Sequence, residues 1–450
     1  MIDPAQQLDA FASHLSDIYF GRNSVSGTLL PYSDILKRGA GACEKTGPAT
    51  SDLAGRLRRL AATVDQGKSL MIRDVLDAVE DAAAALSAQP KPPMKIAYVL
   101  WQFPSLTETF IVNELRELLA KDHDVIIFCR TRTPEAVSMP IPYEIIESFQ
   151  HLATRLRETE RQVVHSHFIY PTVTELVWPA CEMSGVPFTF IPHGQDIFRY
   201  ANDQVNRMGE VVSSRQCKAV FAASRFHARF IQERNAPPHK IILNPNGIDP
   251  SLYEYREPKR PVSRSRAVCA IHRYVAKKGL TNLIAAAKLL EDDGVTVNLF
   301  GFGMLEAEYK AQIEAADIKN VTVGGPVRDR DHMLEIFRSH DLFACPSIRA
   351  DDGDMDGVPT VLMEAMAVGL PVFATTVSGI PDLIEDSVTG FTCEATADSI
   401  AGCIRRFYAT SYAGIRQMAR RGRQCIDQKY NTVQLTRDLL RVWRPDVLLN

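Results

Sequence analysis

Residues 348–384 read IRADDGDMDGVPTVLMEAMAVGLPVFATTVSGIPDLI. Apolar runs at 342–346 and 372–374 predict two buried strands, and the apolar residues between them predict a helix over 360–368. Pro359 fits the first turn of that helix, where its missing N–H costs nothing. A strand, an acidic loop, a helix and a second strand in this order are typical of a parallel sheet with crossover helices.

The same alternation of short apolar runs and amphipathic helices extends in both directions from this segment. A polar, basic stretch at 253–266 separates it into two halves. The further strands that the pattern predicts are 95–101, 124–129, 163–167, 187–192, 219–223, 241–245, 268–272, 296–300, 321–323 and 391–393. The simplest α/β architecture is two doubly wound, Rossmann-like units that face one another across a cleft, with ligands beyond the carboxyl ends of the strands.

Residues 1–93 differ from the rest, because apolar stripes at 53–64 and 72–86 have helical spacing. We expect a helical N-terminal extension here, whose simplest role is packing or self-association. The proline-rich segment QPKPPM ends it. The expected domains are the extension at 1–93, Rossmann-like domains at 94–255 and 256–430, and a C-terminal helix at 431–450 that packs back on the N-terminal domain.

The chain has 450 residues with 51 basic and 54 acidic side chains, a net charge of −3. This balance gives no electrostatic reason to expect nucleic acid as a partner. Nine scattered cysteines suit a reducing compartment, and no apolar run approaches the ~18 residues of a membrane span, so we expect a cytoplasmic protein. Arg420, Arg421 and Arg423 form either a solvated helix face or a weak peripheral contact with the inner membrane face.

The aspartates between 351 and 356 allow three interpretations: a solvated turn, a calcium loop, or one wall of an anion site. The spacing of the first half fits an EF-hand, but Met363 occupies the twelfth position, which disfavours calcium. The free N–H groups at the start of the following helix attract anions and hydroxyl oxygens. Asp356 precedes this helix and Glu364 lies about two turns inside it, ~12 Å further along, so the two carboxylates can hold different parts of one ligand.

Asp356, seven further residues and then Glu364-Ala-Met-Ala-Val-Gly-Leu-Pro-Val372 resemble the motif of the retaining GT-B glycosyltransferases of family 4, also called glycosyl transferases group 1. That family has an acidic residue, usually Glu, followed by seven residues and Glu-Ala-Met-Ala-x-Gly-x-Pro-Val. The resemblance implies a GT-B fold in which Asp356 contacts the donor sugar and Glu364 the nucleotide ribose. Aspartate in place of the usual glutamate shortens the reach by one methylene.

Other segments between about 94 and 425 resemble the same family, in particular its bacterial colanic-acid and exopolysaccharide-type members. The resemblance implies that the loop FPSLTETF at 103–110 approaches the donor phosphate and the acceptor through Thr107, Glu108 and Thr109. The residues implied to act in catalysis are His193, Asp356, Arg273 and Lys278. Those implied to bind the donor are Arg273, Lys278, Gly301, Gly303, Val327, Asp356, Gly357, Val358, Pro359, Thr360 and Glu364.

His165 and His167 end another expected strand. A His-x-His pair can bind a metal ion. No third ligand with suitable spacing is evident, so we expect a structural or acceptor-side role for the pair and no metal site.

The resemblance implies transfer of a hexose-type sugar from a UDP- or GDP-linked donor to a glycan or lipid-linked glycan, with retention of configuration. The process it implies is exopolysaccharide or cell-surface polysaccharide biosynthesis. No cofactor is expected beyond the donor as co-substrate, because Arg273, Lys278 and the helix ends supply positive charge. Two alternatives stay open: a sugar-nucleotide epimerase of GT-B fold, and a catalytically weak subunit of a glycosyltransferase complex. The sequence makes no prediction of the oligomeric state.

Overall fold

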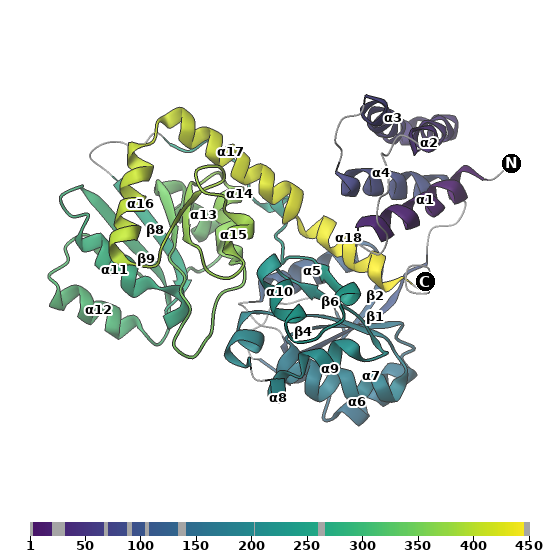
Figure 1. The fold of residues 1–450 in the computed structure, drawn as a ribbon, viewed down its shortest axis with the longest axis horizontal. Helices are drawn as coiled ribbons and strands as arrows, with labels where there is room; N and C mark the ends of the chain where they lie inside the picture. The colour runs from purple at the N-terminus through teal and green to yellow at the C-terminus, as the bar shows by residue number, and fades with distance from the viewer. Residues whose placement is uncertain are drawn as a thin grey trace. The chain divides into compact units, whose positions relative to one another are not determined.

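The structure, a computed structural model, describes residues 3–19, 32–66, 71–87, 92–103, 108–133, 141–201, 203–259 and 266–444 (Figure 1). The chain divides into two compact units. One contains Met1–Met94 and Arg441–Asn450, and the other contains Lys95–Leu440. Thr107 and residues 260–265 of the expected linker lie outside the described residues.

The first unit is helical, as the sequence predicts. Its helices are α1 (Pro4–Tyr19), α2 (Ser33–Thr46), α3 (Ser51–Asp65) and α4 (Ile72–Leu86). Helix α1 packs on α4 and α2 packs on α3, around a core that includes Leu15, Leu57 and Leu76. Of the four, α3 and α4 coincide with the two apolar stripes in the sequence, whereas α2 buries small residues.

A buried ion pair lies inside this unit. Arg441, near the end of α18 (Thr432–Trp443), places Nη2 2.6 Å from Asp77 Oδ1 and 2.9 Å from Glu80 Oε2 of α4. Arg441 is only 4% exposed. Removing one partner of a buried pair leaves an uncompensated charge, so these three residues depend on one another.

The second unit contains two sheets in which every pair of neighbouring strands is parallel. The first sheet has the order β3-β2-β1-β4-β5-β6-β7. Its strands are β1 (Lys95–Phe103), β2 (Asp124–Arg132), β3 (Tyr143–Ile145), β4 (Val163–His167), β5 (Phe188–Ile191), β6 (Cys217–Ala222) and β7 (Ile241–Leu243). All five residues of β4 are buried, which fits a sheet that is covered on both faces.

The second sheet has the order β10-β9-β8-β11-β12-β13. Its strands are β8 (Arg266–Arg273), β9 (Val295–Phe302), β10 (Val321–Val323), β11 (Leu342–Cys345), β12 (Val372–Thr375) and β13 (Phe391–Cys393). Both sheets therefore share the doubly wound order, in which the chain reverses direction across the sheet between its first and fourth strands. In the first sheet this switch point lies between β1 and β4, and in the second between β8 and β11.

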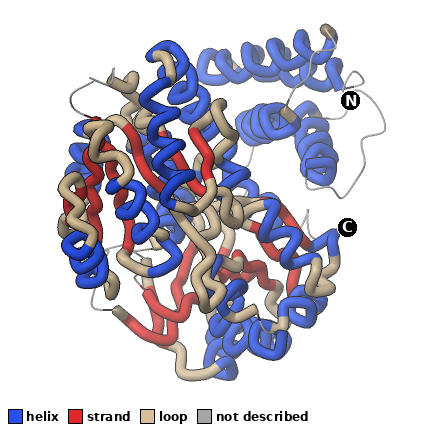
Figure 2. Tube along the Cα trace, turned by 60° about the vertical axis from the view of Figure 1, so that its left-hand side comes forward, coloured by secondary structure: helices blue, strands red, loops and turns tan. Residues whose placement is uncertain are grey.

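Helices cover both sheets (Figure 2). The first sheet carries α5 (Thr109–Ala120), α6 (Phe149–Glu158), a π-helical segment (Ile169–Val177), α7 (Trp178–Ser184), a second π-helical segment (Gln195–Arg199), α8 (Asp203–Asn206), α9 (Met208–Ser213) and α10 (Arg225–Gln232). The second carries α11 (Leu280–Lys288), α12 (Glu306–Ala315), α13 (Arg330–Ser339), α14 (Thr360–Ala367), α15 (Ile380–Leu383), α16 (Ala397–Ala409) and α17 (Tyr412–Lys429). The expected pair of Rossmann-like folds is confirmed.

The chain returns to the first sheet after α17. Ile248, which follows β7, donates its N–H to Tyr430 O (2.9 Å), and Thr432 donates its N–H to Ile248 O (2.8 Å). The side chain of Asn244 donates to Leu435 O at 3.5 Å. These contacts lie where the sequence predicts that the C-terminal helix packs, and the domain bounds themselves stay predictions.

Gly279, the residue before α11, lies where the loops of the second sheet are tightly packed. Its φ is +63°, and a Cβ there would lie 1.9 Å from the carbonyl oxygen of Pro346. Gly294 has a φ of +67° but nothing within 4 Å of such a Cβ. We expect Gly294→Ala to lower the free energy of unfolding by about 1 kcal/mol, the cost of left-handed backbone, and Gly279→Ala by about 3 kcal/mol or more. Denaturant unfolding of both variants measures this, and equal losses would contradict it.

Candidate functional site

The switch point of the second sheet carries three cations. Arg273 ends β8 and is exposed, and a short 3₁₀ turn, Ala276–Lys278, follows it. Lys278 is half-buried, whereas Lys277, which the sequence analysis did not single out, is only 8% exposed. The sequence signal for Lys277 is its place as the first of two consecutive lysines before Gly279. A turn of this kind points neighbouring side chains in different directions, so either lysine can face the site.

The acidic loop after β11 lies against these lysines. Lys278 Nζ is 2.8 Å from Asp356 Oδ2, and Ser347 Oγ donates to the same oxygen at 2.7 Å. Lys277 Nζ is 3.0 Å from Asp354 Oδ2 and 3.8 Å from Asp356 Oδ1. Asp354 and Asp356 are thus counter-ions of the two lysines. The loop is therefore not only a solvated acidic turn, because two of its aspartates are paired with lysines. Its aspartates also do not converge on one point, as the ligands of a calcium ion would.

These contacts fix the ionisation of Asp356. Burial alone would raise the pKa of this carboxyl group, but the charges of Lys278 and Lys277 and the hydrogen bonds from Lys278 and Ser347 lower it to about 2. Asp356 is therefore an anion at any physiological pH. Because its oxygens are already engaged, it is a poor nucleophile but a well-placed acceptor for a hydroxyl group.

Helix α14 begins beside this cluster and carries Glu364 in its second turn. Pro359 is its N-cap, and Val358 and Pro359 are buried while Gly357 and Thr360 are half-buried. The Tyr253 hydroxyl donates to Glu364 Oε1 at 2.8 Å. Burial raises the pKa of Glu364, and the Tyr253 hydrogen bond and the charge of Arg330 oppose that shift.

The remaining predicted donor residues lie at or beyond the carboxyl ends of β9 and β10 in the same sheet. Gly301 and Gly303 occur where β9 ends, with φ of +152° and +150°. A Cβ on Gly301 would lie 1.8 Å from His272 O, so the end of β9 packs directly on the end of β8. Val327 is half-buried against the core around α14. Its part in donor binding stays a prediction.

His193 lies at the carboxyl end of β5 and is 8% exposed. Its backbone N–H donates to Asp196 Oδ1 (2.7 Å), and Asp196 Oδ2 accepts the N–H of Ile169 (2.6 Å). Burial raises the pKa of Asp196 to about 7, against the hydrogen bonds that favour its charged form. Asp196 thus ties the loop that carries His193 to the loop after β4.

The second unit has two lobes, one built on each sheet, and they meet at this point. A Cβ on Gly194 would lie 2.0 Å from the carbonyl oxygen of Met355, the residue before Asp356. Burial lowers the pKa of His193 well below its usual range, and the charge of Lys277 contributes to this shift. The loop that carries His193 therefore touches the loop that carries Asp356, on the side of Lys277.

Arg273 also lies near Glu108, which belongs to the lobe built on the first sheet. Burial raises the pKa of Glu108, and the charges of His167 and Arg273 oppose that shift. Glu108 is half-buried as the N-cap of α5, and Thr109 is the exposed first residue of that helix. Thr107 lies outside the described residues.

A cavity of about 490 Å³ lies next to Glu108 in the first lobe. It occurs beyond the ends of β1 and β4, at the switch point of the first sheet. Its walls combine aromatic rings with polar groups, among them Trp101, Gln102, Glu108, Phe168, Tyr170, Gln195 and Tyr200. A concave site with this lining suits a ligand that has both apolar faces and hydroxyl groups.

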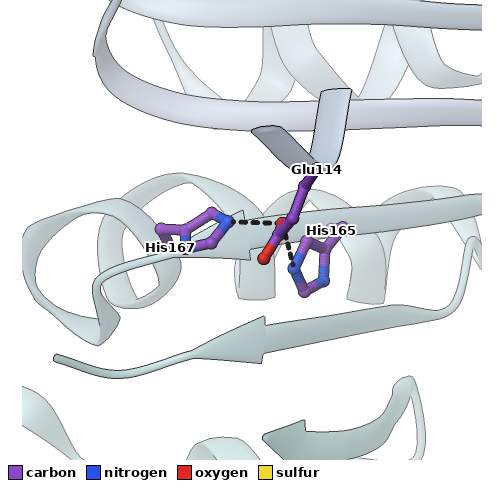
Figure 3. A group of neighbouring side chains, drawn as sticks. All are labelled: Glu114, His165 and His167. Carbon is purple, nitrogen blue, oxygen red and sulfur yellow. Dashed lines mark hydrogen bonds and ion pairs between the residues drawn. The ribbon is translucent and has the colours of Figure 1, made fainter. Parts of the chain in front are cut away.

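His165 and His167, which have no third partner evident from sequence spacing, gain one in the structure. Glu114 of α5 places Oε2 3.2 Å from His167 Nε2 and 3.9 Å from His165 Nε2 (Figure 3). One ligand-type atom from each of the three lies within 4.8 Å of the others. No local pattern in the sequence indicates this contact, because 50 residues separate Glu114 from the pair and only the packing of α5 joins them.

Two family models match this chain. Residues 107–252 match the model described as Glycosyltransferase Family 4, and residues 253–424 match Glycosyl transferases group 1. Together they cover residues 107–424, which contain every strand of the two sheets except β1. The chain belongs to the GT-B glycosyltransferases of group 1 and family 4. The family assignment confirms the resemblance seen in the sequence.

Two curated relatives of this chain are named as glycosyltransferases of colanic acid and amylovoran biosynthesis. The putative colanic acid biosynthesis glycosyltransferase WcaL of Salmonella typhimurium is 30% identical over 46% of this chain and 52% of its own length. The amylovoran biosynthesis glycosyltransferase AmsK of Erwinia amylovora is 30% identical over 48% and 53%. The chain spans about half the length of these curated relatives.

Solved structures share the GT-B fold of this chain. Anabaena Alr3699/HepE, crystallised in complex with UDP, has a TM-score of 0.65 at 19% identity, over 77% of this chain and 99% of its own. WaaG, a glycosyltransferase involved in lipopolysaccharide biosynthesis, has a TM-score of 0.58 at 16% identity, over 78% and 100%. Within the described ranges, no helix of this chain is long and apolar enough to span a bilayer.

The lowered pKa of Asp356 predicts an acid-sensitive cluster. An aspartate whose folded-state pKa lies at about 2, below the usual 3.8, stabilises the fold above pH 4, and this contribution is lost as the pH falls toward 2. The shift corresponds to about 2 kcal/mol. We expect Asp356→Asn to remove this part of the pH dependence in urea unfolding between pH 4 and 2.

Asp356→Asn should also lower the stability at pH 7, because Lys277 and Lys278 lose a buried counter-ion. Asp317→Asn, which removes an exposed partner of Lys319, is the matched control and should leave both quantities nearly unchanged. An unchanged pH profile for Asp356→Asn would contradict the assignment of the cluster.

Proposed function

We propose that this protein transfers a hexose-type sugar from a UDP- or GDP-linked donor to a glycan or lipid-linked glycan, with retention of configuration, in exopolysaccharide or cell-surface polysaccharide biosynthesis. The observation that carries the proposal is the cluster of Arg273, Lys277 and Lys278 at the switch point of the second sheet, beside the start of α14. It supports the binding of a diphosphate next to a sugar. The names of the relatives support the type of pathway.

Charge development explains why this cluster suits transfer. As the glycosidic bond breaks, the leaving nucleoside diphosphate gains negative charge, and fixed cations in a sheltered cleft stabilise that charge most when it has formed. Lys278 is shared between Asp356 and an incoming phosphate, whereas Arg273 is exposed and able to close on it. With the N–H groups at the start of α14, these side chains supply the positive charge, so we propose that the donor is the only co-substrate needed.

The other groups have separate parts in the proposal. Glu364, held by Tyr253, accepts hydrogen bonds from the ribose hydroxyls. Asp356 and His193 face the sugar from the two lobes and steady its positive charge in the transition state. The aromatic cavity beside Glu108 receives the acceptor, whose hydroxyl group attacks the anomeric carbon from the side of the leaving phosphate. That phosphate takes the hydroxyl proton.

Removing the diphosphate clamp should impair chemistry. In Arg273→Met/Lys278→Met we expect transfer to fall by about 10²–10³-fold, because two fixed charges no longer oppose the charge on the leaving group. A donor at 100 times its Kd should stabilise the wild-type protein by about 2.7 kcal/mol in a thermal-shift screen of nucleotide sugars, and the variant should lose this stabilisation. Lys319→Met, at an exposed surface pair, is the matched control.

The outcomes separate the candidate activities. Full transfer by the double variant would overturn the proposed site. Conversion of the donor to an epimer without any acceptor would indicate an epimerase, and donor binding without turnover would indicate an inactive subunit. Arg273→Met alone serves as a second variant that keeps the fold intact, because Arg273 is exposed.

The stereochemistry of the product tests the front-face route. A double displacement requires a free carboxylate nucleophile near the anomeric carbon, with a second carboxyl group about 5 Å away. Asp356 does not suit that part, because Lys278 and Ser347 hold its oxygens. We expect an α-linked donor to give an α-linked product, read from the coupling constant of the new anomeric proton by NMR. A β-linked product would rule out the retaining mechanism.

A further inference from the structure

A chain of hydrogen bonds runs beneath His193 and ends on a carboxylate. Glu114 Oε2 is 3.2 Å from His167 Nε2, and His167 Nδ1 is 3.0 Å from His193 Nε2. Glu114 is 7% exposed, His167 is fully buried and His193 is 8% exposed, so water does not compete for these contacts. Glu114 comes from α5, His167 from the end of β4 and His193 from the loop after β5.

The chemistry of the two ends sets the direction of this chain. A carboxylate has acceptor atoms only, and Glu114 Oε2 also accepts from the Tyr98 hydroxyl at 3.2 Å. His167 must therefore carry its proton on Nε2, and in a neutral ring Nδ1 is then an acceptor. His193 donates from Nε2 to that acceptor, which leaves its own Nδ1 without a proton. The amide nitrogen of Asn246, a donor, lies 3.5 Å from this Nδ1, which agrees with the assignment.

The surroundings hold the ring of His193 in this orientation. It stacks on His167 with centroids 5.2 Å apart and planes at 12°. Phe110 and Phe168 pack on it with centroids at 4.7 and 4.6 Å. Burial lowers the pKa of His193, so the ring stays neutral. A neutral, immobile imidazole has one defined donor and one defined acceptor.

We propose that Glu114 and His167 are positioning residues that fix the tautomer of His193, so that its Nδ1 accepts a hydrogen bond from a hydroxyl group of the bound sugar. The weak 3.5 Å contact with Asn246 is the one that the sugar hydroxyl replaces. The nature of the ligand rests on the proposed function, whereas the order of the protons rests on the geometry alone. Glu114 and His167 touch no substrate in this scheme.

A metal ion held by Glu114, His165 and His167 would reverse the positions of the protons on the rings of His167 and His193. If a metal took His167 Nε2, the proton of that ring would lie on Nδ1 and be donated to His193 Nε2. His193 would then carry its own proton on Nδ1. The tautomer of His193 thus distinguishes the hydrogen-bonded chain from a metal centre, without any measurement of activity.

The first experiment reads this tautomer directly. The full chain, labelled with ¹⁵N only in histidine, is studied by long-range ¹H–¹⁵N correlation NMR at pH 7, and His193→Gln identifies the signals of His193. We expect a protonated Nε2 and an unprotonated Nδ1, with no stoichiometric metal by elemental analysis. A protonated Nδ1, or about one equivalent of bound metal, would overturn the proposal.

The second experiment asks whether the chain acts through His193. His167→Phe keeps a flat, buried ring but removes both nitrogens, and we expect kcat to fall by about 10–100-fold while the KM of the donor changes by less than about 3-fold. In the His193→Gln background the same substitution should cost nothing further. Glu114→Gln, which keeps an acceptor oxygen, should retain more activity than Glu114→Leu.

His165→Phe is the matched control, because His165 is equally buried on the same strand but bonds to Thr189 (2.9 Å) rather than to His193. An equal loss in His165→Phe, or a loss by His167→Phe that persists without His193, would assign His167 a merely structural part and overturn the proposal. If the wild-type protein transfers no sugar, the proposed function fails while the NMR result still decides the proton order.

Discussion

The contact between two neighbouring lysines and two aspartates holds the second lobe's binding edge together. Burying a charged group costs several kcal/mol unless a partner lies close by, so Lys277 and Lys278 are stable where they are only with Asp354 and Asp356 opposite them. Beside these pairs the backbone N–H of Ile348 donates to Lys277 O at 2.8 Å. The long loop before α14 is thereby tied to the turn after β8. The start of α14, with its free N–H groups, takes its position from this tie.

The two sheets have the same topology but carry different kinds of side chains at their switch points. Each places its switch point where two neighbouring strands lead to helices on opposite faces. In the second sheet this point carries cations and carboxylates. In the first it carries aromatic rings, amides and Glu108 around a cavity. Under the proposed function, the charged switch point suits the donor and the aromatic cavity suits the acceptor.

Much of this arrangement could be predicted from the sequence, because it rests on local patterns. The apolar runs gave the strands of both sheets except the three-residue β3, and the spacing of Asp356 and Glu364 gave the family. Helix α2 was missed because its buried face is made of small residues, among them Gly39 and Ala40, which carry little hydrophobic signal. Gly39 instead allows close packing, since a Cβ there would lie 3.0 Å from Leu8.

The parts of the site that could not be predicted depend on contacts between distant segments. Nothing in the run containing Glu114 indicates that its carboxylate meets His167 across 53 residues of chain. Which of Lys277 and Lys278 is the more buried likewise depends on the direction of each side chain in a single 3₁₀ turn. Such turns are too short for periodicity to specify which side chain is buried.

The contact between Gly194 and the carbonyl group of Met355 has a mechanical consequence. Main-chain atoms of the two lobes already touch there, so nothing remains between them that could be compressed. At this point the lobes cannot come nearer without displacing main-chain atoms, so the contact limits how closely they can approach. A side chain larger than hydrogen at position 194 would push Met355, and with it the loop of Asp356, away from the loop of His193.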